Sequence, residues 1–203
     1  MCLRCDSGQY QTEYGATACR DCPGGHFCSV DAAVACSPNT YNPNTSSYLV
    51  TDCVPCPSFT TTGTSTGVAE VAGCVCTSGY YRPADGGKCR PCPIGTDCNA
   101  VTGTTAQTLP VRRGYYRLTE RSSDVRRCPD AGAGCAATEC ADSTSACLGG
   151  DNAEELCRPG LTGPFCMLCH NDTATSRMFY QAADKLNAAR CRSCDDLTST
   201  GLS

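Results

Sequence analysis

The stretch that decides the fold is Cys157–His170, CRPGLTGPFCMLCH, which holds three cysteines, two glycines, two prolines and a terminal histidine. Its C-x2-C-H ending is typical of four kinds of site: half of a zinc site, a haem attachment site, a redox-active pair, or two half-cystines of a small secreted module. Each kind of site requires a different chain around it. The composition and the remaining cysteines therefore decide among the four.

The composition favours cross-links over a hydrophobic core. The chain has 203 residues, of which 22 are Cys, above the roughly 8–10% that marks a disulfide scaffold. Leu, Ile, Val and Phe together number 26, too few for their burial to offset the conformational entropy of ordering the chain. Because the cysteine count is even, every thiol can pair, and closing a loop of ~15 residues contributes about 3 kcal/mol. We predict a small disulfide-rich fold with short β-ribbons and little helix.

Disulfides on this scale persist only in an oxidising compartment, which predicts an extracellular or cell-surface location. No apolar run approaches the ~20 residues that span a membrane, so no direct membrane insertion is expected in this segment. Met1 is followed at once by Cys2 and polar residues instead of a signal peptide, and we expect a mature or cropped piece of a longer protein. The net charge of −4 argues against general nucleic-acid binding.

Three segments repeat one plan, in which a Cys is followed by a Gly/Asn turn, an aromatic residue, a loop and then C-x2-C-P. They are Cys5–Cys28, Cys36–Cys56 and Cys76–Cys98. Tyr10, Tyr41 and Tyr80 occupy matching places, and we interpret them as the miniature core of each module.

This plan resembles the ephrin-receptor-like cysteine-rich repeat, a relative of tumour-necrosis-factor-receptor and EGF-like modules, over residues 2–98. Its C-x2-C-P-x-G-x-x-C element occurs at Cys19–Cys28 and Cys89–Cys98. The second repeat departs from the pattern, because SFTTTGTSTG follows Cys56-Pro57 and the next Cys is Cys74. The spacing from Cys157 to Cys166 is similar to the closing loop of an EGF-like domain, and Cys169 makes it similar to the laminin type. Extracellular proteins of unicellular eukaryotes join these two module types in this order.

The resemblance implies a tandem, elongated array of modules. The expected domains are cysteine-rich repeats at 1–35, 36–75 and 76–111, a connecting Arg-rich and Cys-rich segment at 112–147, a laminin-type EGF-like module at 148–194, and a tail at 195–203.

The resemblance also implies a staircase in which each C-x2-C closes one loop and opens the next. The implied bridges are Cys5–Cys19, Cys22–Cys28, Cys36–Cys53, Cys56–Cys74, Cys76–Cys89, Cys92–Cys98, Cys157–Cys166 and Cys169–Cys191. Four further cysteines pair among themselves in an order that the sequence leaves open: Cys128, Cys135, Cys140 and Cys147. Cys2 and Cys194 are left over, and we expect their partners in missing flanks or in neighbouring copies.

The zinc, haem and redox interpretations of the C-x2-C pairs explain the sequence less well than disulfides do. Six such pairs exist, but ten more cysteines stand outside any pair and only two His are present, which a zinc array does not explain. The haem reading of Cys166–His170 competes with the EGF-like loop and lacks an apolar helical pocket. None of the pairs has the strand–helix context of a redox site. We expect no enzyme, no metal site and no cofactor. We interpret the acidic and amide residues Asp151, Asn152, Glu154 and Glu155 as a solvated loop instead of a calcium site.

An Arg group is the candidate surface for glycan or partner binding, because guanidinium groups hold sulfate and carboxylate bidentately. It lies beside Tyr115 and Tyr116 and comprises Arg112, Arg113, Arg117, Arg121, Arg126 and Arg127. The alternative is that Glu120, Asp124 and solvent satisfy these cations. Asn44 and Asn171 begin sequons and are possible glycosylation sites. The periodicity of residues 176–190, with Ser176 as cap, predicts a helix that packs on its own domain.

These features lead to one functional hypothesis and one alternative. The hypothesis is a stiff, non-enzymatic extracellular segment that has a structural or adhesive role in a cell-surface, matrix or filament assembly. Its partners would be other extracellular proteins, including copies of itself, and glycans. The alternative is the ligand-binding ectodomain of a cell-surface receptor.

Overall fold

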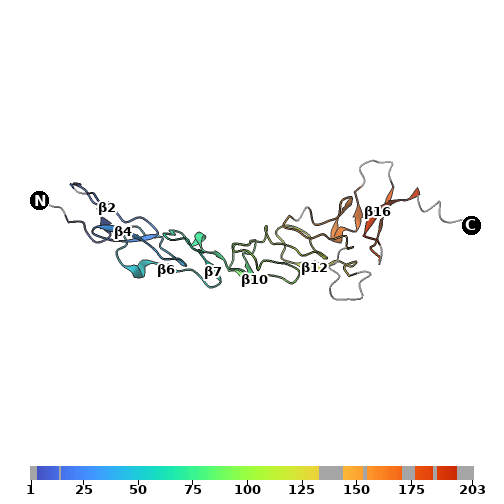
Figure 1. Ribbon diagram of the computed structural model, residues 1–203, viewed down its shortest axis with the longest axis horizontal. Coiled ribbons are helices and arrows are strands. Elements are labelled where there is room, and N and C mark those ends of the chain that lie inside the picture. The colour runs from blue at the N-terminus through green and yellow to red at the C-terminus, as the bar shows by residue number, and fades with distance from the viewer. Residues whose placement is uncertain are drawn as a thin grey trace, which may run out of the picture. The chain divides into compact units, whose positions relative to one another are not determined.

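The computed structural model describes residues 4–13, 15–132, 144–152, 155–170, 177–184 and 187–195. These residues form eight two-stranded sheets, short 3-10 turns and almost no helix (Figure 1). The prediction of a small disulfide-rich fold is confirmed. The chain divides into two compact units, Met1–Tyr80 and Tyr81–Ser203. The finer division into repeats and an EGF-like module stays a prediction.

The sheets are hairpin-like ribbons of strands two to four residues long. They pair β1 (Gln9–Tyr10) with β2 (Arg20–Asp21), β3 (His26–Ser29) with β4 (Ala32–Ala35), β5 (Thr40–Tyr41) with β6 (Val54–Pro55), β7 (Thr60–Thr61) with β8 (Val75–Cys76), β9 (Tyr80–Tyr81) with β10 (Arg90–Pro91), β11 (Tyr115–Arg117) with β12 (Val125–Arg127), β13 (Leu161–Thr162) with β14 (Leu168–Cys169), and β15 (Met178–Gln181) with β16 (Arg190–Ser193). The 3-10 turns are η1 (Val50–Asp52), η2 (Val71–Gly73) and η4 (Pro164–Cys166).

Each ribbon of the first unit begins at a residue that follows a cysteine and has a left-handed backbone conformation. Gly8 and Asn39 have φ of 83° and 65°, a conformation that Gly and Asn adopt at low cost. Tyr10 and Tyr41, which the repeat plan singled out, lie in β1 and β5 and are half-buried. The turn residues therefore set where each ribbon starts.

The ribbon β7–β8 lies where the second predicted repeat departs from the sequence pattern. Phe59 takes the place of the turn residue there, with φ of 63°, and its ring stacks on Tyr80 with centroids 4.4 Å apart. The Cys56–Cys74 disulfide closes this ribbon across 18 residues, as Cys36–Cys53 closes the previous one across 17. The segment SFTTTGTSTG thus belongs to a further ribbon of the same plan.

In the first unit, backbone hydrogen bonds join each ribbon to the next. Gly25 N–H donates to Asn42 O at 2.7 Å, and Cys36 N–H donates to Gly25 O at 2.8 Å. Gly67 N–H donates to Cys36 O at 2.9 Å, and Asn42 N–H donates to Val68 O at 3.0 Å. The buried Asn42 side chain adds a bond from Nδ2 to His26 O at 2.9 Å. Neighbouring ribbons are therefore held by main-chain contacts more than by apolar packing.

Nine disulfides involve the described residues. Seven of the eight bridges that the resemblance implied are recorded with their partners: Cys5–Cys19, Cys22–Cys28, Cys36–Cys53, Cys56–Cys74, Cys92–Cys98, Cys157–Cys166 and Cys169–Cys191. Cys76 and Cys89 are also disulfide-bonded. Cys128 pairs with Cys147, which resolves part of the order left open. Cys2, Cys135 and Cys140 lie outside the described residues.

The second unit has two small apolar clusters. One contains Tyr81, Cys98, Ala106 and Leu109, with Val125 packed against it. The other contains Cys128, Ala146, Cys147, Leu161, Cys166 and Ala189, with Tyr116, Phe165 and Tyr180 packed against it. The ribbon β11–β12 contributes to both clusters, because Val125 and Tyr116 come from its two strands.

The helix expected over residues 176–190 is wrong. Met178–Gln181 and Arg190–Ser193 are strands, with Tyr180 paired to Cys191 in antiparallel register. Cys191 is bonded to Cys169, and this cross-link holds Arg190–Ser193 in an extended ribbon. Tertiary constraint has overridden a local helical pattern. No described helix is long and apolar enough to cross a membrane.

Replacing Gly25 with Ala should destabilise the first unit more than replacing Gly63 with Ala. Both glycines are left-handed, with φ of 79° and 61°, so each alanine costs about 1–2 kcal/mol in strain. A Cβ on Gly25 would also overlap the Gly67 carbonyl, whereas a Cβ on Gly63 meets nothing within 4 Å. Amide exchange measured by NMR should accelerate at Cys36 and Gly67 in Gly25→Ala only. Equal acceleration in both variants would contradict this account.

Candidate binding site on the Arg-rich ribbon

The ribbon β11–β12 carries three of the six candidate arginines, and its pairing sorts them onto two faces. Tyr115 pairs with Arg127, Tyr116 with Arg126, and Arg117 with Val125. Because side chains alternate along a strand, Tyr115, Arg117 and Arg127 share one face, and Tyr116 and Arg126 share the other. The Arg group is therefore not one patch.

Arg117 is buried, with 1% of its surface exposed. Its guanidinium donates to the carbonyls of Ala106, of Gln107 at 2.9 Å, of Glu120 at 3.1 Å and of Asp151 at 3.4 Å. Burial lowers the pKa of Arg117, and the charges of Glu120 and Asp151 partly oppose that shift. The expectation that Arg117 belongs to a surface binding patch is wrong, because its charge serves to join three loops.

The remaining arginines of the group are exposed, and some have partners. Arg127 lies over the ring of Tyr115, 5.7 Å from its centroid. That ring packs on Gly95, where a Cβ would overlap it. Arg112 lies 3.9 Å from Asp97 Oδ1, a separation at which a solvated pair contributes little. Arg113 and Arg121 are exposed, so they remain candidates for contact with a partner.

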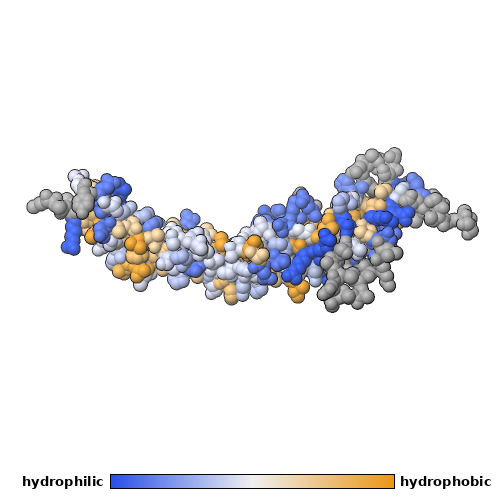
Figure 2. All heavy atoms as spheres, viewed as in Figure 1, coloured by the Kyte–Doolittle hydropathy of each residue, from blue (hydrophilic) through white to orange (hydrophobic). Residues whose placement is uncertain are grey.

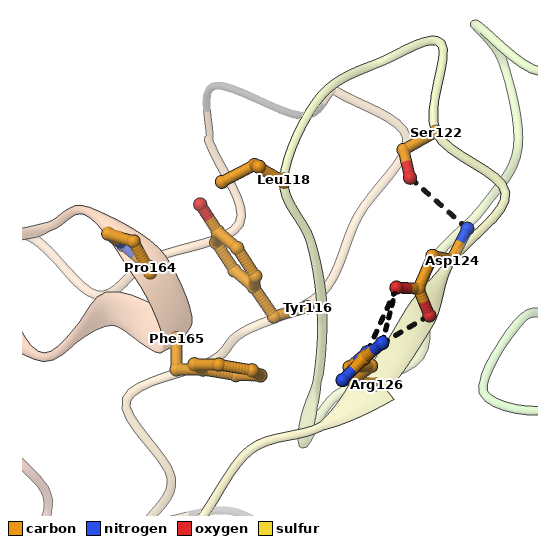
Figure 3. Close-up of a pocket in the computed structure, with 7 residues that line it drawn as sticks. All are labelled: Tyr116, Leu118, Ser122, Asp124, Arg126, Pro164 and Phe165. Carbon is orange, nitrogen blue, oxygen red and sulfur yellow. Dashed lines mark hydrogen bonds and ion pairs between the residues drawn. The ribbon is translucent and has the colours of Figure 1, made fainter.

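The other face of the ribbon borders a pocket with a volume of about 340 Å³. Its lining is Tyr116, Leu118, Ser122, Asp124, Arg126, Pro164 and Phe165. Figure 3 shows the rings of Tyr116 and Phe165 on one side and the Asp124–Arg126 pair on the other. The two rings are 5.6 Å apart between centroids and tilted by 45°, a favourable aromatic geometry.

Asp124 and Arg126 form the polar side of the pocket. Arg126 Nε donates to both carboxylate oxygens of Asp124, at 3.0 and 2.9 Å, and the second guanidinium nitrogen lies 2.8 Å from Oδ2. These bonds lower the pKa of Asp124 and raise that of Arg126. The Asp124 amide donates to Ser122 Oγ at 3.1 Å, which fixes the turn that carries the carboxylate. The alternative interpretation, in which nearby acids satisfy the arginines, is correct for Arg126.

Sequence reasoning missed Phe165 and Leu118 as members of this site. Phe165 lies some 40 positions from the Arg group in the sequence, in the loop closed by Cys157–Cys166. It is left-handed, with φ of 55°, as is the following Cys166, with φ of 59°. The only signal in the sequence is the Pro-Phe step directly before a half-cystine. Only the packing of η4 against β11 brings the two segments together.

The other sequence candidates are placed as follows. Asn44 is exposed, so its sequon is accessible, while Asn171 lies outside the described residues. Asp151 offers its carbonyl to Arg117. Cys19 and Cys22 bond to different partners, as do Cys166 and Cys169. A sulfur held in a disulfide has no thiolate to give to zinc or to a haem thioether.

Two further features concern metals and free thiols. Within the described ranges, no three His, Cys, Asp or Glu side chains gather as a metal site requires. Cys194 is half-buried and has no disulfide partner in the part of the chain that the structure describes.

The second unit also contains a buried carboxylate. Asp130 accepts hydrogen bonds from Ser145 Oγ at 2.9 Å, from the Ala146 amide at 2.7 Å and from the Tyr180 hydroxyl at 3.2 Å. Burial and the Asp130 charge together raise the pKa of Tyr180 to about 12. Because Asp130 and its donors come from three segments, the cluster is a structural tie within the unit.

The Arg117→Met variant should lose about 2–4 kcal/mol in the free energy of unfolding, because four carbonyls lose a charged donor inside the protein. The control is Arg113→Met, an exposed position where the loss should stay within about 0.5 kcal/mol. Urea unfolding followed by circular dichroism, with the disulfides intact, measures both. Equal stability of the two variants would contradict the structural role of Arg117.

Tyr180 should ionise near pH 12, above the ordinary value of 10.0. Its raised folded-state pKa means that Tyr180 contributes stability below about pH 10, which is lost as the pH rises from 10 to 12. Stopped-flow absorbance at the phenolate band, compared between the native chain and Tyr180→Phe, isolates this group. If the step that Tyr180→Phe removes lies near pH 10 instead of near pH 12, the raised pKa of Tyr180 is refuted.

The comparison with known family models gave no match. The chain is similar to cysteine repeat modular protein A of Toxoplasma gondii, with 31% identity over 101 residues. That match covers 36% of this chain and 3% of the Toxoplasma protein, so the chain spans a small fraction of the length of this relative. Together with the disulfides, the similarity supports cysteine-rich repeats and fits a secreted or surface protein.

Proposed function

We propose that the chain is a non-enzymatic extracellular segment with a structural or adhesive role in a cell-surface, matrix or filament assembly. The single observation that carries the proposal is the ladder of main-chain bonds between successive disulfide-closed ribbons, exemplified by Gly25–Asn42 and Gly67–Cys36. Modules that contact their sequence neighbours through the backbone resist bending without a large core. Similarity to a protein named for modular cysteine repeats supports the same role.

The surface of the first unit offers a feature suited to assembly. Hydrophobic atoms gather on the surface around η1 (Figure 2), where Leu49, Val50 and Val54 are 47%, 64% and 42% exposed. Contiguous apolar surface of this kind is typical of contact with another protein.

The finer module types belong to the same proposal. Residues 2–98 would be ephrin-receptor-like repeats, and residues 148–194 a laminin-type EGF-like module. The disulfides support this, because Cys53 closes one loop while Cys56 opens the next, and Cys166 and Cys169 do the same.

A ligand-binding receptor ectodomain is the second candidate. The exposed Arg113 and Arg121 and the pocket of Tyr116 and Phe165 favour it, since aromatic and Arg side chains are enriched in binding surfaces. Asn44 would carry a glycan on an exposed loop.

The test is to locate the native protein in the cells that make it, using an antibody against this segment. We expect labelling of intact, unpermeabilised cells, and recovery in an insoluble fraction that dissolves when reductant is added. Recovery as a detergent-soluble protein joined to a membrane anchor and a cytoplasmic domain would favour the receptor. A cytosolic protein with free thiols would contradict both.

A further inference from the structure

We propose that the pocket between the β11–β12 ribbon and η4 binds the ring of a neutral pyranose sugar. This assigns a ligand site to a segment whose proposed role is structural, and it gives that segment a means of adhesion. The site lies wholly within the second unit, and its lining comes from two segments that the fold brings together, Tyr116–Arg126 and Pro164–Phe165.

The apolar side of the pocket suits the face of a sugar ring. A pyranose presents several C–H groups on one face, and these carry partial positive charge that is attracted to the negative face of an aromatic ring. Tyr116 and Phe165 are tilted by 45° to one another and form an angled apolar wall. Leu118, which is 68% exposed, extends this wall at the rim.

The polar side of the pocket suits sugar hydroxyls. The Asp124 carboxylate and the Arg126 guanidinium lie together as an acceptor and a donor in fixed relative positions, with Oδ2 and the guanidinium nitrogen 2.8 Å apart. Adjacent hydroxyls on a sugar ring can each donate and accept, so they can bond to both groups at once. Ser122 Oγ accepts from the Asp124 amide, which leaves its own proton free to donate.

The charges select a neutral ligand. Of the seven lining residues, Asp124 and Arg126 alone carry formal charge, and they neutralise each other through direct hydrogen bonds. A sulfate or carboxylate would lie beside the Asp124 carboxylate, which repels it, and the charge of Arg126 is already compensated by that carboxylate. This distinguishes the pocket from the sulfated or acidic glycan site that the Arg group suggested. A purely apolar occupant would leave the Asp124–Arg126 pair without a role.

The turn that carries Phe165, on the aromatic side of the pocket, has a strained backbone. Phe165 and Cys166 are consecutive non-glycine residues with positive φ, 55° and 59°, and each such residue costs on the order of 1–2 kcal/mol. The Cys157–Cys166 disulfide and the bond from Cys166 N–H to Gly163 O, at 3.0 Å, hold this turn. The turn places Phe165 against Tyr116 before any ligand arrives, and strain of this kind is found at binding sites.

The experiment titrates the purified chain with simple glycosides and follows aromatic and Arg side-chain signals by NMR. The probes are methyl glucoside, methyl galactoside and methyl mannoside, with methyl glucuronide as the charged counterpart. We expect saturable binding of at least one neutral glycoside, with a Kd on the order of 1 mM. The signals of Phe165 and Arg126 should shift, and the glucuronide should bind more weakly than the glucoside.

Matched variants identify the site. Phe165→Leu and Asp124→Asn should each weaken binding by about tenfold, as expected from removing one aromatic contact or one bond to a charged group. The control is Phe59→Leu, which replaces another left-handed aromatic, with φ of 63°, and should leave the affinity unchanged. Disulfide mapping verifies folding. If Phe165→Leu misfolds, Asp124→Asn decides, because it changes the polar side of the pocket and leaves the Phe165 turn intact.

Several results would overturn the proposal. They are no saturable binding of any neutral glycoside, tighter binding of the glucuronide than of the glucoside, an equal loss of affinity in Phe59→Leu, and shifts at Phe165 caused only by an apolar peptide. Binding is measured on the isolated chain, so its failure would leave the test of cellular location unaffected. A cytosolic location would likewise leave the binding result standing.

Discussion

Disulfides stabilise this chain in place of the large apolar core found in most proteins of its size. Ten of the eighteen buried hydrophobic residues among those described are cysteines. The cross-links act chiefly by restricting the unfolded chain, so they stabilise ribbons only two to four residues long. Each ribbon alone is too small to be stable in water. Everything else, including the placement of turns and aromatic rings, depends on those covalent loops.

Given the loops, glycine decides how the ribbons meet. Gly25 and Gly95 occupy the same place in the C-P-x-G element of two repeats, and each is left-handed, with φ of 79° and 88°. Gly25 admits the Gly67 carbonyl, while Gly95 admits the ring of Tyr115. The same motif therefore allows a main-chain contact in the first unit and a contact with an aromatic ring in the second. The contact between Gly95 and Tyr115 orients the Arg-rich ribbon.

A fold with little interior leaves many side chains exposed, and the ribbon geometry determines which of them meet. The alternation along β11 turns Arg117 into the protein and leaves Tyr116 beside Phe165. The Asp124–Arg126 pair then closes the opposite side of the pocket. Ribbons of this kind leave room for small, separate contact sites instead of one deep cleft.

The sequence by itself determined the fold class, because cysteine abundance, scarce apolar residues and Gly/Asn turns leave few other stable solutions. It also determined most of the recorded disulfide pairs, through their resemblance to known modules. Tertiary structure alone decided the rest. Residues 178–181 and 190–193 became strands because the Cys169–Cys191 bridge overrides a weak helical period. The Arg group was divided because strand register, which linear spacing does not encode, assigns each side chain to a face. Phe165 joined Tyr116 only through contacts between segments distant in the chain.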